Sequence, residues 1–287
     1  MGVFIKYGVM AQVLKAVIKT LSKVATNPTA LSQGQSFLVA TTVGNYALFG
    51  GGEDDYEDRT NVVNAYNKSL TRSIPTALSS TRTSLAATTV GDYALFGGGY
   101  RDSSVVDAYN TSLTRSIPTA LSSARSNLAA TTVSDYALFG GGWRSGSYSS
   151  VVDAYNTSLT RSTPTVLSKA RRYLAATTVG NYALFGGGND GSYSSVVDAY
   201  NTSLTRTTPT ALSSARDRLA ATTVSDYALF GGGSNSSVVD AYNTSLTRST
   251  PTALSEAKSD LAATTVGDYA LFAGGSWSSV VDAYTVS

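Results

Sequence analysis

Short runs of alternating apolar and polar residues recur along the chain, separated by small residues. In one copy, residues 85–90 read Leu-Ala-Ala-Thr-Thr-Val and residues 93–96 read Tyr-Ala-Leu-Phe, with a Gly-Asp pair between them. Two small residues between β-rich runs are typical of a tight hairpin turn. A third apolar run covers residues 105–109, and a fourth run covers 115–121. The pattern therefore predicts units of four short antiparallel strands.

The same unit recurs along nearly the whole chain. Its Tyr-Ala-Leu-Phe segment begins at Tyr46, Tyr93, Tyr136, Tyr182, Tyr227 and Tyr269. The resulting steps of 42 to 47 residues are typical of four-stranded propeller blades and exceed the length of ankyrin and TPR units. We therefore predict an all-β, six-bladed β-propeller over residues 25–287, preceded by a separate segment at residues 1–24.

One proline occurs in each repeat, always in the predicted outermost strand. Proline has no N–H to donate and is confined to the edges of sheets, so its placement agrees with the strand order. The prolines are Pro28, Pro75, Pro118, Pro164, Pro209 and Pro251.

The first proline precedes the first full repeat, whereas the last repeat stops after its third strand. Residues 28–32 read Pro-Thr-Ala-Leu-Ser, as residues 118–122 do. We therefore expect the N-terminal segment to lie alongside residues 280–285 as the outermost strand of the last blade. Such pairing closes the ring and removes its open edge.

The repeat resembles that of the kelch family. The matching residues are Gly97 and Gly98 after a hydrophobic strand, the later Tyr109, and Arg125, which opens the next blade. The family's tryptophan, seven residues after the tyrosine, is replaced throughout, by Ser73, Ser116, Ser162, Thr207 and Ser249. The resemblance covers residues 26–287 and implies a kelch-like propeller, but a fold alone does not assign a function.

Differences among the repeats are concentrated in two classes of loop. One class joins the second strand to the third, from residues 53–61 in the first repeat to residues 276–279 in the last. The other class joins the fourth strand to the next blade, from residues 33–37 to residues 256–260. Both classes leave an up-and-down blade at the same end, so we expect one variable face and one uniform face. Loops held by a rigid scaffold commonly carry binding residues.

Aromatic side chains gather in these variable loops. Large rigid rings bury much area at a low entropic cost, and they suit stacking on sugars or gripping a peptide. The alternative is that the rings only cover neighbouring loops. The candidate ligand-binding aromatics are Trp143, Trp277, Tyr56, Tyr100, Tyr148, Tyr173 and Tyr193, joined by Phe37.

A basic residue opens the inner strand of most repeats, and ring symmetry would gather these residues near the channel mouth. There they could bind carboxylates or anionic sugars. The kelch resemblance implies the same role, because similar arginines in peptide-binding members engage acidic ligands. The alternative is that each side chain hydrogen-bonds to blade carbonyls. The residues are Arg82, Arg125, Arg171, Arg216 and Lys258, with Gln35 in the remaining repeat.

Acidic residues form two further groups. Five of them crowd residues 53–58, but their spacing fits no EF-hand loop, so we expect a solvated loop and no bound metal. The other group recurs once per repeat near an arginine across a hairpin, for example Asp153 near Arg161. We predict cross-strand ion pairs there.

Composition limits the available chemistry. With 21 basic and 19 acidic residues the net charge is +2, which argues against a nucleic-acid partner. The absence of cysteine and histidine excludes thiolate nucleophiles, imidazole bases and Cys/His zinc sites, and we expect no cofactor. No apolar run approaches the roughly 20 residues of a transmembrane span. We therefore expect a binding protein rather than an enzyme.

Apolar residues recur with a helical period along the first 24 residues. An amphipathic helix is predicted, and Lys15 interrupts what would be the apolar core of a signal peptide, so no cleavable leader is expected. Its apolar stripe could pack on the propeller, a larger assembly, a second copy or a lipid surface. The stripe consists of Val9, Val13, Leu14, Val17, Ile18 and Leu21.

Together these features lead to a functional hypothesis. The variable face would present a noncatalytic recognition surface to a glycan or protein ligand. Near-identical repeats with a surface rich in Ser, Thr and Tyr suit a display protein such as a bacteriophage tail fibre or virion appendage, at a virion or extracellular surface. The alternatives are a six-bladed, kelch-like sugar mutarotase and a structural scaffold subunit docked through residues 1–24.

Overall fold

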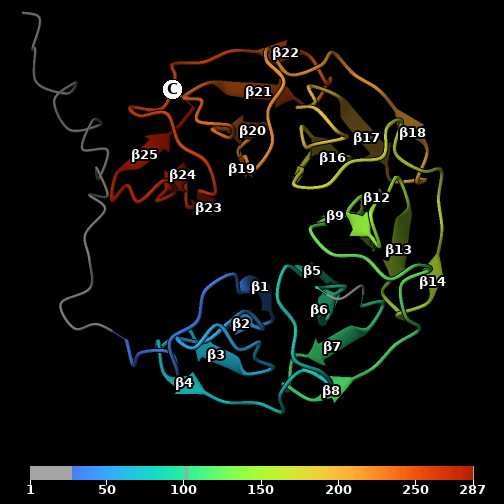
Figure 1. The fold of residues 1–287 in the computed structure, drawn as a ribbon, viewed down its shortest axis with the longest axis vertical. Helices are drawn as coiled ribbons and strands as arrows, with labels where there is room; N and C mark the ends of the chain where they lie inside the picture. The colour runs from blue at the N-terminus through green and yellow to red at the C-terminus, as the bar shows by residue number, and fades with distance from the viewer. Residues whose placement is uncertain (1–27, 101–102, 287) are drawn as a thin grey trace, which may run out of the picture.

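The computed structural model describes residues 28–100 and 103–286, and this part of the chain is all-β. Six antiparallel sheets follow one another around a central axis, as Figure 1 shows. The six-bladed propeller predicted from the repeats is confirmed. The predicted helix at residues 1–24 lies outside the described residues. None of the described residues forms a helix long and apolar enough to cross a membrane.

Five of these blade sheets have four strands each and the last has three; residues 143–148, in a loop of the third blade, add a separate two-stranded sheet. The first three blades contain β1 (Val39–Val43), β2 (Tyr46–Gly50), β3 (Val63–Asn67), β4 (Arg72–Ser73), β5 (Ala86–Val90), β6 (Tyr93–Gly97), β7 (Val106–Asn110), β8 (Arg115–Ser116), β9 (Ala129–Val133), β10 (Tyr136–Gly140), β11 (Trp143–Arg144), β12 (Ser147–Tyr148), β13 (Val152–Asn156) and β14 (Arg161–Ser162). The last three contain β15 (Ala175–Val179), β16 (Tyr182–Gly186), β17 (Val197–Asn201), β18 (Arg206–Thr207), β19 (Ala220–Val224), β20 (Tyr227–Gly231), β21 (Val239–Asn243), β22 (Arg248–Ser249), β23 (Ala262–Val266), β24 (Tyr269–Ala273) and β25 (Val281–Tyr284).

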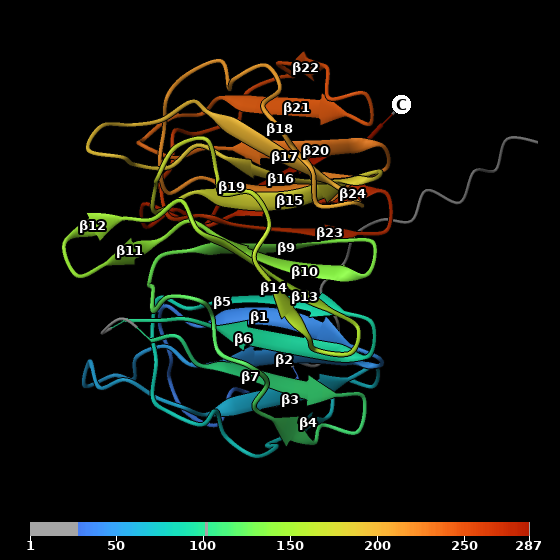
Figure 2. The same cartoon turned by 90° about the vertical axis from the view of Figure 1, so that its right-hand side faces the viewer.

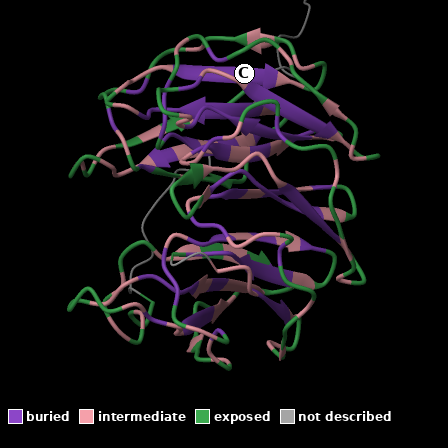
Figure 3. Ribbon diagram, turned by 45° about the vertical axis from the view of Figure 1, so that its right-hand side comes forward, coloured by how far each residue is buried: buried purple, intermediate pink, exposed green. Residues whose placement is uncertain are grey.

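The core lies between neighbouring blades rather than within one blade. One cluster combines Val90 and Leu95 of the second blade with Phe139 and Tyr155 of the third. The Phe139 and Tyr155 rings meet edge to face, with centroids 6.0 Å apart, a preferred geometry for aromatic pairs. Figure 3 shows the buried strands inside and the exposed loops and turns outside. Each blade is therefore stabilised mainly by the blades on either side.

The innermost strands carry small residues because the blades converge at the axis. Their threonine hydroxyls join adjacent blades; the side-chain oxygens of Thr88 and Thr132, for example, lie 2.8 Å apart. Threonine side chains also line a small channel of about 360 Å³. The equivalent pairs at the other joined blades are Thr41–Thr89, Thr131–Thr178, Thr177–Thr223 and Thr222–Thr265.

Residues 28–32 contact the first blade. The Tyr66 hydroxyl donates a hydrogen bond to Thr29 O at 2.7 Å. The linkers between later blades make the same contact with the blade that follows, as when Tyr155 donates to Thr119 O at 2.7 Å. Residues 28–32 therefore contact the first blade as an interblade linker contacts the blade that follows it.

The ring closure predicted from that match differs from the structure. The sixth sheet contains only β23, β24 and β25. In complete blades the linker leucine donates its N–H to its own blade, as Leu121 does to Ser104 O at 2.8 Å. Leu31 makes no such bond to any described residue. The repeat aligns residues 25–26 with the outermost strand, and these lie outside the described residues.

The first and sixth blades stand apart, and we call this opening the seam (Figure 1). At the other five junctions a glycine packs against a phenylalanine of the next blade; a Cβ added to Gly231 would lie 2.7 Å from Phe272 Cε1. The sixth blade carries Ala273 at this position. Its methyl group excludes the same close approach, and Val266 is 46% exposed where its counterpart Val90 is 1% exposed.

The two ends of the propeller differ as predicted. In the side view of Figure 2, the β11–β12 hairpin projects from the end that carries the variable loops. The two loop classes lie side by side there, since Ser126 of one class forms a β-bridge with Trp143 of the other. At the opposite end, tight turns of adjacent blades meet; a Cβ added to Gly91 would lie 3.0 Å from Thr157. The variable and uniform faces are therefore confirmed.

Candidate binding face

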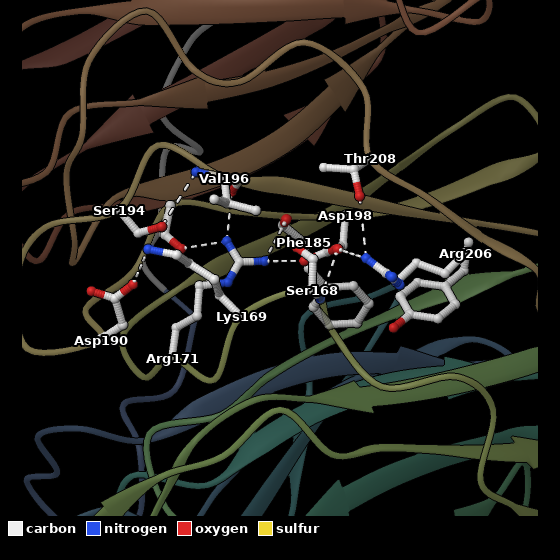
Figure 4. Close-up of polar contacts among 12 residues, drawn as sticks. Ser168, Lys169, Arg171, Phe185, Asp190, Ser194, Val196, Asp198, Arg206 and Thr208 are labelled. Carbon is white, nitrogen blue, oxygen red and sulfur yellow. Dashed lines mark hydrogen bonds and ion pairs between the residues drawn. The ribbon is translucent and has the colours of Figure 1, made fainter.

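The recurring basic residues are buried inside the blades. Figure 4 shows the fourth-blade example: Arg171, 0% exposed, pairs with Asp198 at 2.5 Å and donates to Val196 O at 2.5 Å. Burial lowers the pKa of Arg171, and the charge of Asp198 opposes that shift. The structure thus shows the alternative in which the arginines hydrogen-bond to blade carbonyls. A ligand on the face does not reach this guanidinium.

The same arrangement recurs in the other blades. Arg82, Arg125 and Arg216 are buried, and each pairs with the aspartate of its blade's third strand. Lys258 in the sixth blade is also buried, and its Nζ lies 3.1 Å from Asp282. We therefore assign these five basic residues to the scaffold.

The predicted cross-strand ion pairs are present beside them. Arg161 Nη1 lies 2.8 Å from Asp153 Oδ1, and Arg206 lies at the same distance from Asp198. Asp153 and Asp198 thus each pair with two arginines: the buried arginine of the same blade and the cross-strand arginine predicted from the sequence. The carboxylate also accepts a backbone N–H, from Ser168 to Asp198 at 3.0 Å in the fourth blade. A carboxylate with these three contacts stabilises the blade.

Of the seven candidate aromatics from the sequence, the structure brings three together. Trp143 and Tyr148 pair across the β11–β12 hairpin with ring centroids 4.9 Å apart, and Tyr173 approaches from the next interblade loop. The others are spread over the face. Tyr56, Tyr100, Tyr193 and Trp277 are exposed, and Trp277 is fully so.

A residue that the sequence analysis missed joins the three rings. The guanidinium carbon of Arg172 lies 4.4 Å from the Trp143 ring centroid and 4.8 Å from that of Tyr173. It also lies 5.7 Å from the Tyr148 centroid. These distances are within the range of cation–π contacts. We call Trp143, Tyr148, Arg172 and Tyr173 the aromatic cage.

A cavity of about 910 Å³ opens beside the cage on the variable face. We call this cavity the mouth. Each blade lines it with a leucine that is the same in every repeat and with the residue just before it, which differs in every repeat. We call the differing residues the mouth positions: Phe37, Ser84, Asn127, Tyr173, Arg218 and Asp260.

The mouth positions share one backbone conformation. Their φ angles lie between +51° and +56°, in the left-handed region that ordinary side chains adopt at a cost. Backbone hydrogen bonds link most of them around the ring, for example from Tyr173 N to Asn127 O at 3.1 Å and from Arg218 N to Tyr173 O at 2.9 Å. The ring thus holds six different side chains in equivalent places.

Charges at the mouth are mixed. Arg218 Nη1 lies 3.6 Å from Asp260 Oδ2, and Glu53 also lines the cavity. The acidic loop that contains Glu53 uses Asp54 in its own turn, where the carboxylate accepts the N–H groups of Tyr56 and Asp58 at 3.0 Å each. No group of three or more acidic side chains suited to a metal ion occurs among the residues that the structure describes.

Comparison with known proteins leaves the chain unassigned. No protein-family profile matches it, and no curated protein is similar to it. Membership of the kelch family stays a prediction from the repeat. The fold and the geometry of the variable face are therefore the basis of the functional argument.

Proposed function

We propose that this protein is a noncatalytic recognition module that binds a glycan or protein ligand in the mouth. The observation that carries the proposal is the set of mouth positions. Each leucine that follows a mouth position is the same residue because the scaffold needs it, whereas the six preceding residues differ in charge, size and polarity. A scaffold role alone would not explain this divergence at one strained backbone position.

Other properties of the face support the same function. The mouth volume lies within the range of roughly 300–1,000 Å³ that is usual for ligand sites. Packed blades hold its walls, which limits the entropy lost on binding. The further proposal of a bacteriophage tail or virion appendage rests on the near-identical repeats and the Ser/Thr/Tyr-rich surface, and it places the ligand on a host surface.

The proposal is tested by changing side chains at the mouth while keeping the backbone. Ser84 already occupies this position in the second blade, so Phe37→Ser and Tyr173→Ser are compatible with the conformation. The double variant should lose binding to any glycan or protein partner that the native protein captures on a glycan array or from a defined protein panel.

The matched control lies on the uniform face. Asp92 and Asp135 are exposed residues of the tight turns there, and Asp92→Ser with Asp135→Ser should leave binding unchanged. Loss of binding in the control, or full binding in the mouth variant, would contradict the proposal. Unfolding in urea confirms that both double variants are folded.

A further inference from the structure

Arg172 holds a positive charge that no acidic group neutralises. Among the described residues, its guanidinium makes no ion pair and no hydrogen bond, and its Nε is buried without a partner. By contrast, Arg171 is paired with Asp198, and Arg218 lies near Asp260. The Nε of Arg171 is likewise without a partner, so the feature that distinguishes Arg172 is the missing acidic partner.

The aromatic cage holds this guanidinium within cation–π distance of three rings. Cation–π contacts use the ring faces, so the N–H donors at the edge of the guanidinium are left for another acceptor. A carboxylate is the acceptor that a guanidinium binds best, through two parallel hydrogen bonds. Because the rings already hold the side chain in place, little rotamer entropy is lost when such a group binds.

The rest of the mouth narrows the class of ligand. Glu53 and Asp260 line the cavity as hydrogen-bond acceptors and repel additional negative charge, while Asn127 supplies an amide. Arg218 also lines the cavity and lies 3.6 Å from Asp260, so the mouth itself carries mixed charge. One unpaired cation at the edge of such a cavity suits a ligand with one negative charge and several hydroxyl donors. An acidic sugar has this composition, and its C–H surface also packs on aromatic rings. A peptide with several acidic residues would be repelled.

We propose that Arg172, held in the aromatic cage at the edge of the mouth, is its anion-binding residue and that the ligand is a saccharide bearing a carboxylate. The guanidinium does not line the cavity itself, but it contacts Tyr173, which does. This inference rests on the proposed function and specifies its ligand. It also explains why a basic residue occurs at this position in one repeat alone: the equivalent residues are Ser36, Thr83, Ser126, Asp217 and Ser259.

The two tryptophans of the chain allow a direct test. In a Trp277→Phe background, Trp143 is the sole tryptophan, and its fluorescence reports on the cage. Titration with sialyllactose and with galacturonate, which carry one carboxylate each, should change this fluorescence. Lactose and the methyl ester of galacturonate, which lack the free carboxylate, should bind at least about tenfold more weakly.

Substitutions of Arg172 test whether its guanidinium itself binds the acidic saccharides. Arg172→Met should lose about ten- to a hundredfold in affinity for the acidic saccharides, measured by calorimetry because the substitution also alters the fluorescence. Arg172→Lys should bind more weakly than the native protein, since an ammonium does not form the paired hydrogen bonds. Arg59→Met is the control, because Arg59 stacks on Tyr100 at 5.3 Å on the same face, and Tyr100 does not line the mouth whereas Tyr173 of the cage does.

The outcomes distinguish this inference from the proposed function. Equal affinity for acid and ester, or an Arg172→Met variant that binds as the native protein does, overturns the inference. If the Phe37→Ser, Tyr173→Ser variant still loses binding to another ligand, the recognition function stands. Binding of a glutamate-rich peptide in place of the saccharides would overturn the ligand class. Binding that survives the mouth variant would overturn both proposals.

Discussion

At the scale of single residues, the repeats separate scaffold from function. Sequence analysis placed ligand binding on the basic residue that recurs, but the structure buries Arg171 and presents Arg172. Recurrence at one position in every blade reflects a contact that every blade needs. The differing neighbour was the better signal, and it was visible in the sequence. What the sequence could not supply is the cage itself, because its rings come from two loops.

The buried ion pairs predict a large effect of one substitution. Asp198→Asn should lower the free energy of unfolding by about 3–5 kcal/mol, because it leaves Arg171 buried without a full counter-charge. Unfolding in urea measures this effect. The control is the neighbouring exposed pair of Lys169 and Asp190, 2.8 Å apart, also drawn in Figure 4. Lys169→Ala should change stability by less than about 1 kcal/mol, and equal effects of the two variants would refute the argument.

The left-handed mouth positions predict a dependence on side-chain shape. Ser84 has a φ of 56°. Ser84→Val should lower the free energy of unfolding by about 1–2 kcal/mol, since a β-branched residue tolerates this conformation poorly. Ser84→Gly should be neutral or slightly stabilising, because relief of strain offsets the flexibility gained in the unfolded chain. Thermal unfolding compares the two, and equal stability would show that the backbone is not strained there.

At the scale of elements, the sequence predicted the inner strands almost to the residue. The runs at 93–96 and 105–109 became β6 (Tyr93–Gly97) and β7 (Val106–Asn110). The predicted outer strand at 115–121 contains only the two residues of β8 (Arg115–Ser116). Its remainder crosses to the next blade, where a tyrosine hydroxyl binds Thr119 O. The alternation of apolar and polar residues within a strand is a local sequence pattern. The path of the segment after β8 depends instead on its contacts with the neighbouring blade.

Close packing between blades predicts that one methyl group added at the interface between them destabilises the protein. A Cβ at Gly140 would lie 2.7 Å from Phe185 Cε1, so Gly140→Ala should lower the free energy of unfolding by about 1–3 kcal/mol. The matched variant is Ala273→Gly at the equivalent position of the sixth blade, which removes a methyl group at the open seam. It should cost no more than about 1 kcal/mol, from added chain flexibility. A Gly140→Ala protein as stable as the native one would contradict the packing geometry.

Buried tyrosines predict sensitivity to alkaline pH. Burial, aided by a nearby aspartate, raises the pKa of Tyr155 and its counterparts Tyr109, Tyr200 and Tyr242 above the ordinary value of 10.0, and it raises the pKa of Tyr284 in the sixth blade to about 12. A raised folded-state pKa stabilises the protein below pH 10, and this stabilisation is lost as the pH rises further, by about 1.4 kcal/mol per pH unit for each tyrosine.

Tyrosinate absorbance and circular dichroism recorded together check this expectation. A step in tyrosinate absorbance well above pH 10 should coincide with loss of the folded signal. Tyr155→Phe should reduce this step. Ionisation of all 18 tyrosines in one step near pH 10 with the fold intact would be incompatible with burial of the set.

At the scale of the whole molecule, the repeat count predicted the number of blades but not the state of the ring. Six similar units imply six similar junctions, yet the junction between the last blade and the first differs in a residue that faces it. The sixth blade has Ala273 where the others have glycine. This difference was present in the sequence, but its meaning depends on which surfaces meet.

The seam can be compared with a complete junction by engineered disulfides, since the chain contains no cysteine. Thr88 and Thr132 lie with side-chain oxygens 2.8 Å apart, so Thr88→Cys with Thr132→Cys should form a disulfide readily on oxidation. Thr42 and Thr264 are the equivalent residues across the seam. Thr42→Cys with Thr264→Cys should form far less disulfide, because the open blades hold the two thiols apart.

Free-thiol counts by mass spectrometry measure the disulfide yield at both junctions, with each single variant as a control for cross-linking between molecules. Equal yields at the two junctions would show that the ring closes in solution and that the added methyl of Ala273 is accommodated.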